Sequence, residues 1–138
     1  YFNYELMKQL NDNKQMTDVW RLPAIATWEK SCGKHPTQKP LALLTRIILS
    51  STKKGAWILD PFAGSSTTGI ASNLIGRRFL GIEKELTFTE MGKKRKIEIE
   101  NVGKFNEYRS KIKDIAVADF FEPTNMVCEE GFDYGLPF

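Results

Sequence analysis

The sequence predicts an α/β fold in which helices flank a parallel sheet. Two short apolar runs at residues 57–59 and 79–82 are typical of buried strands. Between them, a glycine-bearing turn at residues 62–66 leads into a helix-prone segment at residues 67–74, which Gly76 ends. Strand, turn, helix and strand in this order predict a βαβ unit with a right-handed crossover.

Further helices are predicted on both sides of this unit. Apolar residues at helical spacing indicate a helix over residues 41–51, which begins directly after Pro40. Residues 86–113 are helix-prone throughout, and Gly92 and Gly103 are the candidate points of division. The basic cluster within this stretch, at residues 93–96, is interpreted as a solvated helix face rather than a DNA contact.

The chain is divided into three segments. Residues 1–34 show no sustained period and are expected to be loop-rich with one short helix, whereas residues 35–114 hold the predicted βαβ unit and its helices. Residues 115–138 form an acidic tail, in which residues 117–121 have the composition of a strand and residues 131–138 that of irregular structure.

Composition narrows the class of protein. The 138 residues, 41% of them hydrophobic, suffice for one compact domain, and no run is long enough to span a bilayer. Cys32, Cys128 and the single His35 have neither metal-ligand nor disulfide spacing, so we expect a cytoplasmic protein without a metal site. The chain begins with Tyr1 and not with Met, and no charged region followed by an apolar stretch comes first, so we expect a fragment or a partly ordered chain and not a secreted precursor.

Charge is distributed unevenly along the chain. Residues 1–114 carry all 20 Lys and Arg beside 12 acids, a balance of +8, whereas residues 115–138 carry five acids and no base. A basic body suits a polyanion such as DNA, although an ordinary solvated surface explains it equally well.

The turn at residues 64–69 (GSSTTG) has the spacing of the dinucleotide fingerprint G-x-G-x-x-G, with Ser66 in place of the second glycine. It follows a strand, opens a helix and precedes Glu83, which ends the next strand as the ribose-binding acid of such sites does. Small residues let a ligand approach the backbone, and a carboxylate accepts hydrogen bonds from a ribose diol. The pattern therefore predicts a nucleoside-containing ligand. A Walker A loop is excluded, because Ile70 follows Gly69.

The residues around this turn carry a resemblance to a known family. KHPTQKP at residues 34–40, LDPFAGSSTTG at 59–69 and RRFLGIE at 77–83 resemble, in order and spacing, the β class of DNA amino-methyltransferases, which modify N6 of adenine or N4 of cytosine. The resemblance covers residues 18–96 and implies a partial Rossmann-like fold that binds S-adenosyl-L-methionine. Residues 1–20 are similar to adenine-N6 methyltransferases of GATC restriction-modification systems.

The resemblance also implies where the cofactor lies. Residues 34–40 would flank its methionine end, and the acid after the second strand would hold its ribose hydroxyls. Ser66 departs from the usual glycine, and a serine there requires a negative φ or tolerated strain and would crowd the cofactor. Structural roles compete at several positions, for example a core role for Phe62. The implied cofactor-binding residues are Thr37, Gln38, Lys39, Asp60, Phe62, Gly64, Ser66 and Glu83.

The catalytic loop of the family, Asp/Asn/Ser-Pro-Pro-Tyr/Phe, is absent from the 138 residues. In that family its polar groups accept the hydrogens of the amine, and its aromatic ring stacks on a flipped-out base. In the β-class order this loop lies upstream, so no catalytic residue is assigned and the chain alone is expected to be inactive. The expected partners are DNA, double-stranded or single-stranded, and either the upstream part of the same enzyme or a second copy.

Three alternatives to an adenine-N6 enzyme stay open. The first is an N4-cytosine methyltransferase. The second is a degenerate, non-catalytic module for DNA binding or assembly, which the missing loop, Ser66 and the acidic tail favour. An NAD-dependent oxidoreductase would explain the glycine turn but not the KHPTQKP segment.

Overall fold

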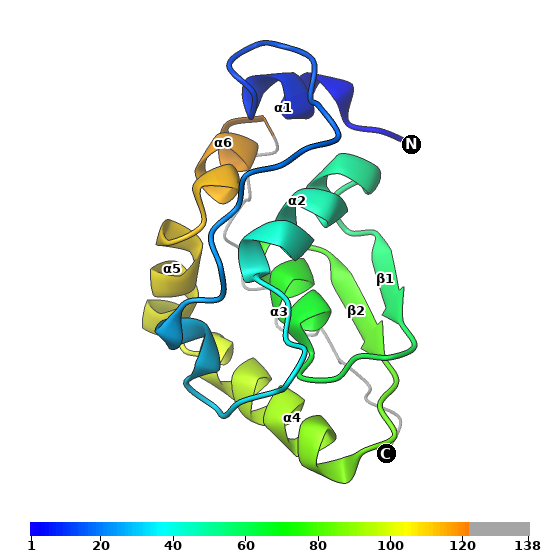
Figure 1. Cartoon of the computed structure of the whole chain (residues 1–138), viewed down its shortest axis with the longest axis vertical. Coiled ribbons are helices and arrows are strands. Elements are labelled where there is room, and N and C mark those ends of the chain that lie inside the picture. Colours follow the sequence, from blue (N-terminus) through cyan, green and yellow to red (C-terminus); the bar gives the residue numbers. More distant parts are fainter. Residues whose placement is uncertain (122–138) are drawn as a thin grey trace.

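A computed structural model describes residues 1–121 of the chain (Figure 1). Helices pack against a small parallel sheet, and the chain starts at the end of the molecule that holds α1. In chain order the elements are α1 (Tyr4–Gln9), the 3-10 helix η1 (Thr27–Lys30), α2 (Leu41–Ser51), β1 (Trp57–Asp60), α3 (Thr67–Leu74), β2 (Arg78–Gly81), α4 (Leu86–Glu100), α5 (Val102–Ser110) and α6 (Lys113–Phe121).

The predicted βαβ unit is confirmed. β1 and β2 pair in parallel, with Trp57 opposite Arg78 and Asp60 opposite Gly81, and α3 connects them. Both α2 and α3 have the predicted bounds, while β2 begins and ends one residue earlier than expected. Gly69, at the last glycine position of the fingerprint, lets α3 approach β2, because a Cβ at this position would lie 2.6 Å from the ring of Phe79.

The helix-prone stretch divides at Asn101 and not at its glycines. The Asn101 side chain accepts a hydrogen bond from the backbone N–H of Lys104 at 3.0 Å and thereby caps α5, whereas Gly92 and Gly103 lie inside helices. An asparagine cap ends one helix and starts the next more effectively than a glycine within a helix breaks it.

The strand predicted at residues 117–121 is wrong, because these residues belong to α6. Ile115 and Ala118, three residues apart, are buried on one side of this helix, and Asp114 at its start binds Arg46 of α2. Tertiary packing therefore overrides the strand propensity of the aromatic residues. The predicted irregular structure at residues 131–138 lies outside the described residues.

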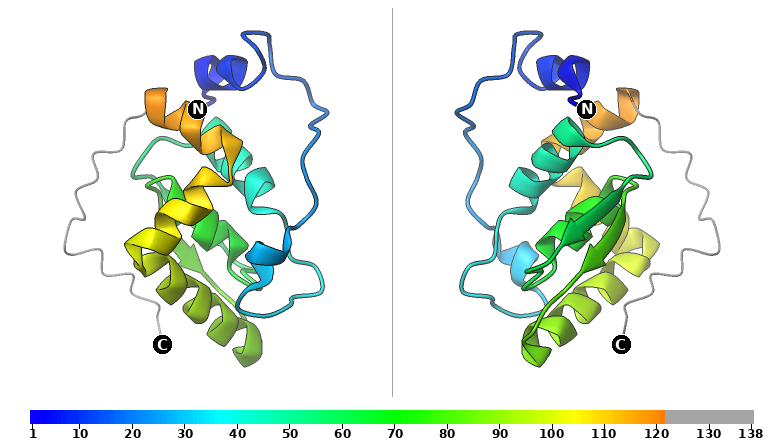
Figure 2. Two further views of the ribbon diagram at one scale, coloured as in Figure 1. Left: turned by 90° about the vertical axis from the view of Figure 1, so that its left-hand side faces the viewer. Right: turned by 90° about the vertical axis from the view of Figure 1, so that its right-hand side faces the viewer.

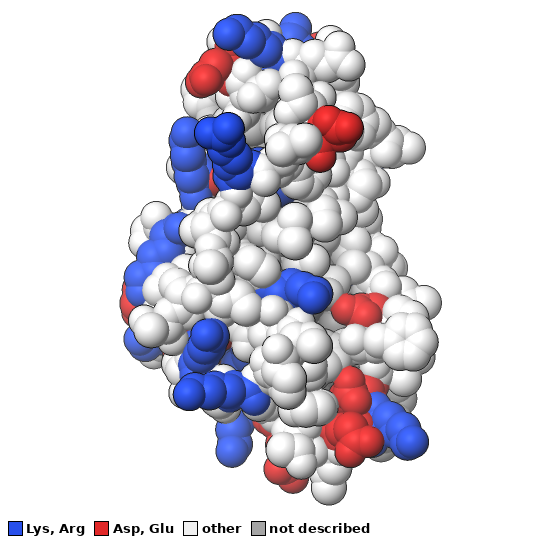
Figure 3. Space-filling model, in the orientation of Figure 1, with Lys and Arg blue, Asp and Glu red and all other residues white. Residues whose placement is uncertain are grey.

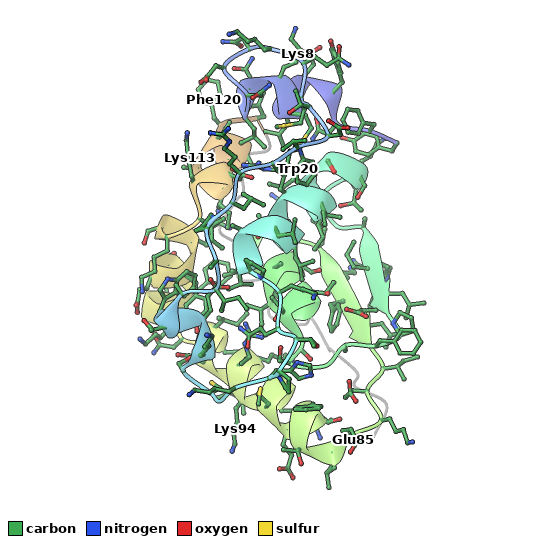
Figure 4. All side chains as sticks on the ribbon, viewed as in Figure 1. Lys8, Trp20, Glu85, Lys94, Lys113 and Phe120 are labelled. Carbon is green, nitrogen blue, oxygen red and sulfur yellow. The ribbon has the colours of Figure 1, made fainter. Side chains whose placement is uncertain are left out.

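The hydrophobic core lies between α2, α3 and the C-terminal helices, and α1 adds the buried Leu6 and Met7. Trp20, in the long loop before η1, lies near α2 with its ring 5.4 Å from the guanidinium carbon of Arg46 (Figure 4). No helix among residues 1–121 is long and apolar enough to cross a membrane.

Within the described part of the chain, helices cover one face of the sheet and none covers the other. In the right-hand view of Figure 2 the helices lie behind the two strands. Trp57 and Leu59, which share the outer face of β1, are each 62% exposed, and Ile58 between them packs on the core. Among the described residues β1 has β2 as its one paired neighbour, so its other edge is open.

Candidate cofactor-binding site

The loops at the carboxyl ends of β1 and β2 form a hollow of about 170 Å³. Parallel strands bring their carboxyl ends to the same edge of a sheet, which is where ligands bind in this fold class. Six of the eight predicted residues line the hollow, whereas Ser66 and Glu83 do not. The lining residues among those predicted are Thr37, Gln38, Lys39, Asp60, Phe62 and Gly64.

Asp60, the last residue of β1, fixes the shape of the turn. One carboxylate oxygen accepts a hydrogen bond from the backbone N–H of Phe62 at 3.0 Å, and the other accepts one from the hydroxyl of Thr68 at 2.6 Å. The carboxylate thus joins the end of the strand to the first turn of α3. Phe62 in the same turn is 88% exposed, which excludes the core role considered for it and leaves its ring available to a ligand.

His35 holds the KHPTQKP segment against this turn. Gly64 has a φ of 53°, and a Cβ there would lie 3.1 Å from the Nε2 of His35. The same ring lies 4.1 Å from that of Phe88 in α4, centroid to centroid, and its Nδ1 accepts a hydrogen bond from the backbone N–H of Thr37 at 3.2 Å. His35 also lines the hollow, although it is not among the cofactor-binding residues that the resemblance implies.

Gln38 is buried and anchored to η1. Its side-chain nitrogen donates to the backbone carbonyl of Glu29 at 2.9 Å. The Glu29 carboxylate, itself buried, accepts from the backbone N–H groups of Leu41 at 2.8 Å and Ala26 at 3.1 Å. The start of α2 and the KHPTQKP segment are therefore held together, while Lys39 between them is exposed.

Glu98 of α4 holds the loop that follows η1. Its Oε2 accepts hydrogen bonds from the hydroxyls of Ser31 and Tyr108, both at 2.9 Å, and from the thiol of Cys32 at 3.3 Å. Together with the contacts of Gln38, these bonds fix both ends of the segment that forms one wall of the hollow.

Glu83 lies beside the hollow, and its carboxylate is bound by backbone N–H groups. It accepts hydrogen bonds from the N–H of Glu85 at 2.8 Å and from that of Gly64 at 2.7 Å. These bonds, with that of Glu85 the strongest influence, lower the pKa of Glu83 and favour its charged form. An ionised carboxylate has about four acceptor positions, so a diol can still be bound.

Ser66 adopts the strained alternative considered for it, with a φ of 58° in the left-handed region. Its side chain lies against α4, because a Cβ built on Gly92 would be 2.4 Å from the Ser66 hydroxyl oxygen. The hydroxyl is therefore placed next to α4 and not in the hollow.

Arg95 of α4 lies outside the hollow but contacts the turn that forms it, a role that the sequence did not suggest. It was grouped with the solvated cluster at residues 93–96, yet it is 3% exposed, and its Nη1 donates to the carbonyl of Ser65 at 2.7 Å and the hydroxyl of Thr67 at 2.8 Å. Its neighbours Lys93 and Lys94 are exposed, as expected.

The chemistry of the hollow suits one end of a charged nucleoside cofactor. An exposed ammonium at Lys39 and the hydroxyl of Thr37 match a carboxylate, and the carboxylate of Glu83 beside them matches hydroxyls. A volume of about 170 Å³ lies below the roughly 300 Å³ at which sites for whole drug-sized ligands begin, so the hollow accommodates part of such a cofactor. Within residues 1–121, no group of three or more His, Cys, Asp or Glu side chains could hold a metal ion.

Comparison with known proteins identifies similar sequences. Residues 2–94 match a family model described as DNA methylase. The type II methyltransferase M2.MboI of Moraxella bovis is 62% identical over 113 residues, which cover 82% of this chain and 41% of the relative. M2.DpnII of Streptococcus pneumoniae is 56% identical over 101 residues, with coverages of 73% and 37%. M2.LlaDCHI of Lactococcus lactis subsp. cremoris is 55% identical over 95 residues, with coverages of 69% and 35%.

The chain thus spans about two fifths of the length of the curated relatives it matches. A solved structure, that of an M1.HpyAVI–SAM complex, is 50% identical with a TM-score of 0.44, over 45% of this chain and 31% of the other.

Proposed function

The chain belongs to the DNA methylase family, and we propose that it forms the S-adenosyl-L-methionine-binding portion of an adenine-N6 DNA methyltransferase. The observation that carries this proposal is the hollow at the carboxyl ends of β1 and β2, where six of the predicted residues, from the KHPTQKP and DPFAGSS segments, lie together. The relatives are named as type II methyltransferases, which supports an enzyme of a restriction-modification system.

Seven of the eight predicted residues have a proposed role toward the cofactor. Lys39 and Thr37 bind its carboxylate, and Glu83, ionised at neutral pH, accepts hydrogen bonds from its ribose hydroxyls. The exposed ring of Phe62 covers the cofactor and excludes water. When bound, S-adenosyl-L-methionine supplies the methyl group of its sulfonium. Gly64 and Asp60 shape the turn around it, and Gln38 holds the opposite wall.

We further propose that the chain alone does not methylate DNA, and that it needs a segment with the Pro-Pro-Tyr/Phe loop. The open edge of β1 supports this proposal, since the apolar side chains of Trp57 and Leu59 are largely exposed beside it. A strand from the part of such a relative that this chain does not match would pair at that edge, and the segments that follow or precede it would cover the exposed face. DNA is the proposed substrate. Figure 3 shows Lys and Arg spread over one face with acids between them, so this face presents no single basic patch.

Calorimetric titration with S-adenosylhomocysteine tests the cofactor site. The folded chain is expected to bind it, and Glu83→Ala is expected to weaken binding by about 10-fold or more, the equivalent of at least ~1.4 kcal/mol. Glu85→Ala is the matched control, because this exposed acid donates to Glu83 through its backbone N–H and not through its side chain (Figure 4). No binding by a well-folded sample would refute the proposal.

A methylation assay on unmethylated GATC DNA tests whether the chain needs a second segment for activity. The chain alone is expected to show no turnover, whereas turnover is expected when the segment of M2.MboI that this chain does not match is added. Turnover by the chain alone would disprove its dependence on a second segment.

A degenerate module is the second candidate function, favoured by the absence of the catalytic loop from the sequence. It predicts DNA binding that weakens with rising salt while S-adenosylhomocysteine is not bound. The two titrations, with DNA and with the cofactor product, therefore separate the candidates.

A further inference from the structure

The turn that forms the hollow contains two left-handed residues close together. Gly64 has a φ of 53°, and Ser66 has a φ of 58° and a ψ of 31°. The left-handed region suits glycine but strains serine, and strained backbone persists only where its surroundings enforce it. The contacts that enforce this conformation therefore determine the shape of one wall of the hollow.

Arg95 of α4 contacts the turn on both sides of Ser66. Its Nη1 donates to the carbonyl oxygen of Ser65 at 2.7 Å, to the hydroxyl of Thr67 at 2.8 Å and to the hydroxyl of Ser65 at 3.3 Å. Ser65 and Thr67 are themselves 3% and 4% exposed, and their hydroxyls lie 3.2 Å apart. One nitrogen of a buried guanidinium thus holds the residues before and after the strained serine.

Burial of the Arg95 guanidinium is energetically unfavourable, which indicates that its hydrogen bonds to the turn have a role. Within residues 1–121 no carboxylate lies within 4.0 Å of its guanidinium, and its Nε and Nη2 are buried without a hydrogen-bond partner. Burial lowers the pKa of Arg95, but arginine remains protonated in proteins. A buried, incompletely paired charge is unfavourable, so a side chain kept in this position requires an explanation.

Gly92, one helical turn before Arg95, leaves room for the side chain of Ser66. A Cβ at Gly92 would lie 2.4 Å from the Ser66 hydroxyl oxygen and 3.0 Å from its Cβ. Residues three apart lie on the same side of a helix, so Gly92 and Arg95 meet the turn together. Gly92, which has no side chain, lets α4 lie against the turn, and the hydrogen bonds of Arg95 hold it there.

We propose that Arg95 is a positioning residue for cofactor binding, which holds residues 64–67 in the conformation that lines the hollow. Arg95 itself does not line the hollow and acts on the cofactor through Ser65 and Thr67. The inference rests on the proposed cofactor site, but it assigns a role to a residue outside that site.

Arg77 provides a matched control for a merely structural role. It is also 3% exposed, and it donates to the carbonyl oxygens of Ile75 at 2.7 Å and Thr52 at 2.8 Å. Both acceptors lie before the strands, at the end of the sheet away from the hollow. Loss of either arginine should lower stability, but only the loss of Arg95 should loosen the turn.

Titration calorimetry with S-adenosylhomocysteine, on whole chains that circular dichroism shows to be folded, provides the first measurement. Arg95→Met is expected to weaken binding by about 10–100-fold, by analogy with the outer-shell residues that orient the protein ligands of a metal ion. Arg95→Lys, which keeps the charge but not the planar fork, should restore part of the affinity. Arg77→Met should leave the affinity within about 3-fold of the original, which corresponds to ~0.65 kcal/mol. Equal losses for Arg95→Met and Arg77→Met, or no loss for Arg95→Met, would overturn the proposal.

Amide hydrogen exchange of the cofactor-free chain provides the second measurement. Faster exchange at the Ser66 amide, which donates to the carbonyl of Ala63 at 2.8 Å, is expected in Arg95→Met and not in Arg77→Met. If the original chain binds no S-adenosylhomocysteine, the proposed function fails, and this exchange still decides whether Arg95 holds the turn. If Arg95→Met does not fold, Arg95→Lys and Thr67→Val take its place. Unchanged exchange and affinity in both would refute the role.

Discussion

Gly92→Ala is expected to destabilise the chain only while Ser66 is present. The new Cβ would lie 2.4 Å from the Ser66 hydroxyl oxygen and 3.0 Å from the Ser66 Cβ. Rotation of the serine side chain relieves the first contact. The second joins two Cβ atoms, whose positions follow the backbone, so α4 or the turn must move by a few tenths of an ångström.

The magnitude follows from two opposing effects. Overpacking of a well-packed position costs about 1–3 kcal/mol. Replacing a glycine inside a helix by alanine gains about 1 kcal/mol, so the net loss in unfolding free energy should be about 0–2 kcal/mol. In a chain that also carries Ser66→Gly the clash disappears and the helical gain remains. Ser66→Gly alone also relieves about 1–2 kcal/mol of left-handed strain, offset in part by the entropy of glycine.

Urea unfolding of the original chain, the two single variants and the double variant measures the coupling between these positions. We expect a coupling free energy of about 1–3 kcal/mol, as for residues in direct contact. Gly103→Ala is the control, because the nearest atom to its Cβ would be the Asn101 side-chain oxygen and not Ser66. Additivity of Gly92→Ala and Ser66→Gly within about 0.5 kcal/mol would refute the contact.

Three further predictions concern buried or hydrogen-bonded side chains. Asp114→Ala should lower the unfolding free energy, measured with urea, by about 3–5 kcal/mol. The Asp114 carboxylate accepts two hydrogen bonds, at 2.7 and 3.0 Å, from the largely buried Arg46 guanidinium, which would lose its partner charge. A loss below ~1 kcal/mol would contradict this expectation. Thr45→Val should raise the unfolding free energy by about 1 kcal/mol, since the fully buried Thr45 hydroxyl has no hydrogen-bond partner within residues 1–121, and a decrease would indicate an interaction of the hydroxyl. The pKa of Glu83 lies below 4.5 in the folded chain, so its stabilisation is present above that pH and is lost as the pH falls through the folded value. The difference in unfolding free energy between the original chain and Glu83→Gln should therefore shrink below pH 4.5, and a pH-independent difference would exclude this linkage.

The structure follows the sequence most closely where the pattern is local. The bounds of α2 and α3 were predicted because helical spacing, Pro40 and Gly76 mark them within a few residues. The division at Asn101 was available from the same kind of signal, an N-cap residue, but two glycines were favoured instead. At residues 117–121 strand propensity conflicted with burial against the core, and burial decided the structure.

The candidate site shows the same difference between features set by local sequence signals and features set by tertiary packing. Asp60, Gly64 and Glu83 were expected to lie together because they follow the carboxyl ends of neighbouring parallel strands. Thr37 was placed beside them by the resemblance to the β class of DNA amino-methyltransferases, and in the structure it lines the same hollow as Asp60 and Gly64. The sequence by itself therefore determined the βαβ unit, the glycine turn and the family. Only the tertiary structure decided that Arg95 is buried against a turn 30 residues earlier, and that Ser66 faces Gly92 instead of the hollow. The physical reason is that periodicity and capping act between residues a few positions apart, whereas the packing of α4 on the turn depends on contacts between distant residues that no local pattern marks.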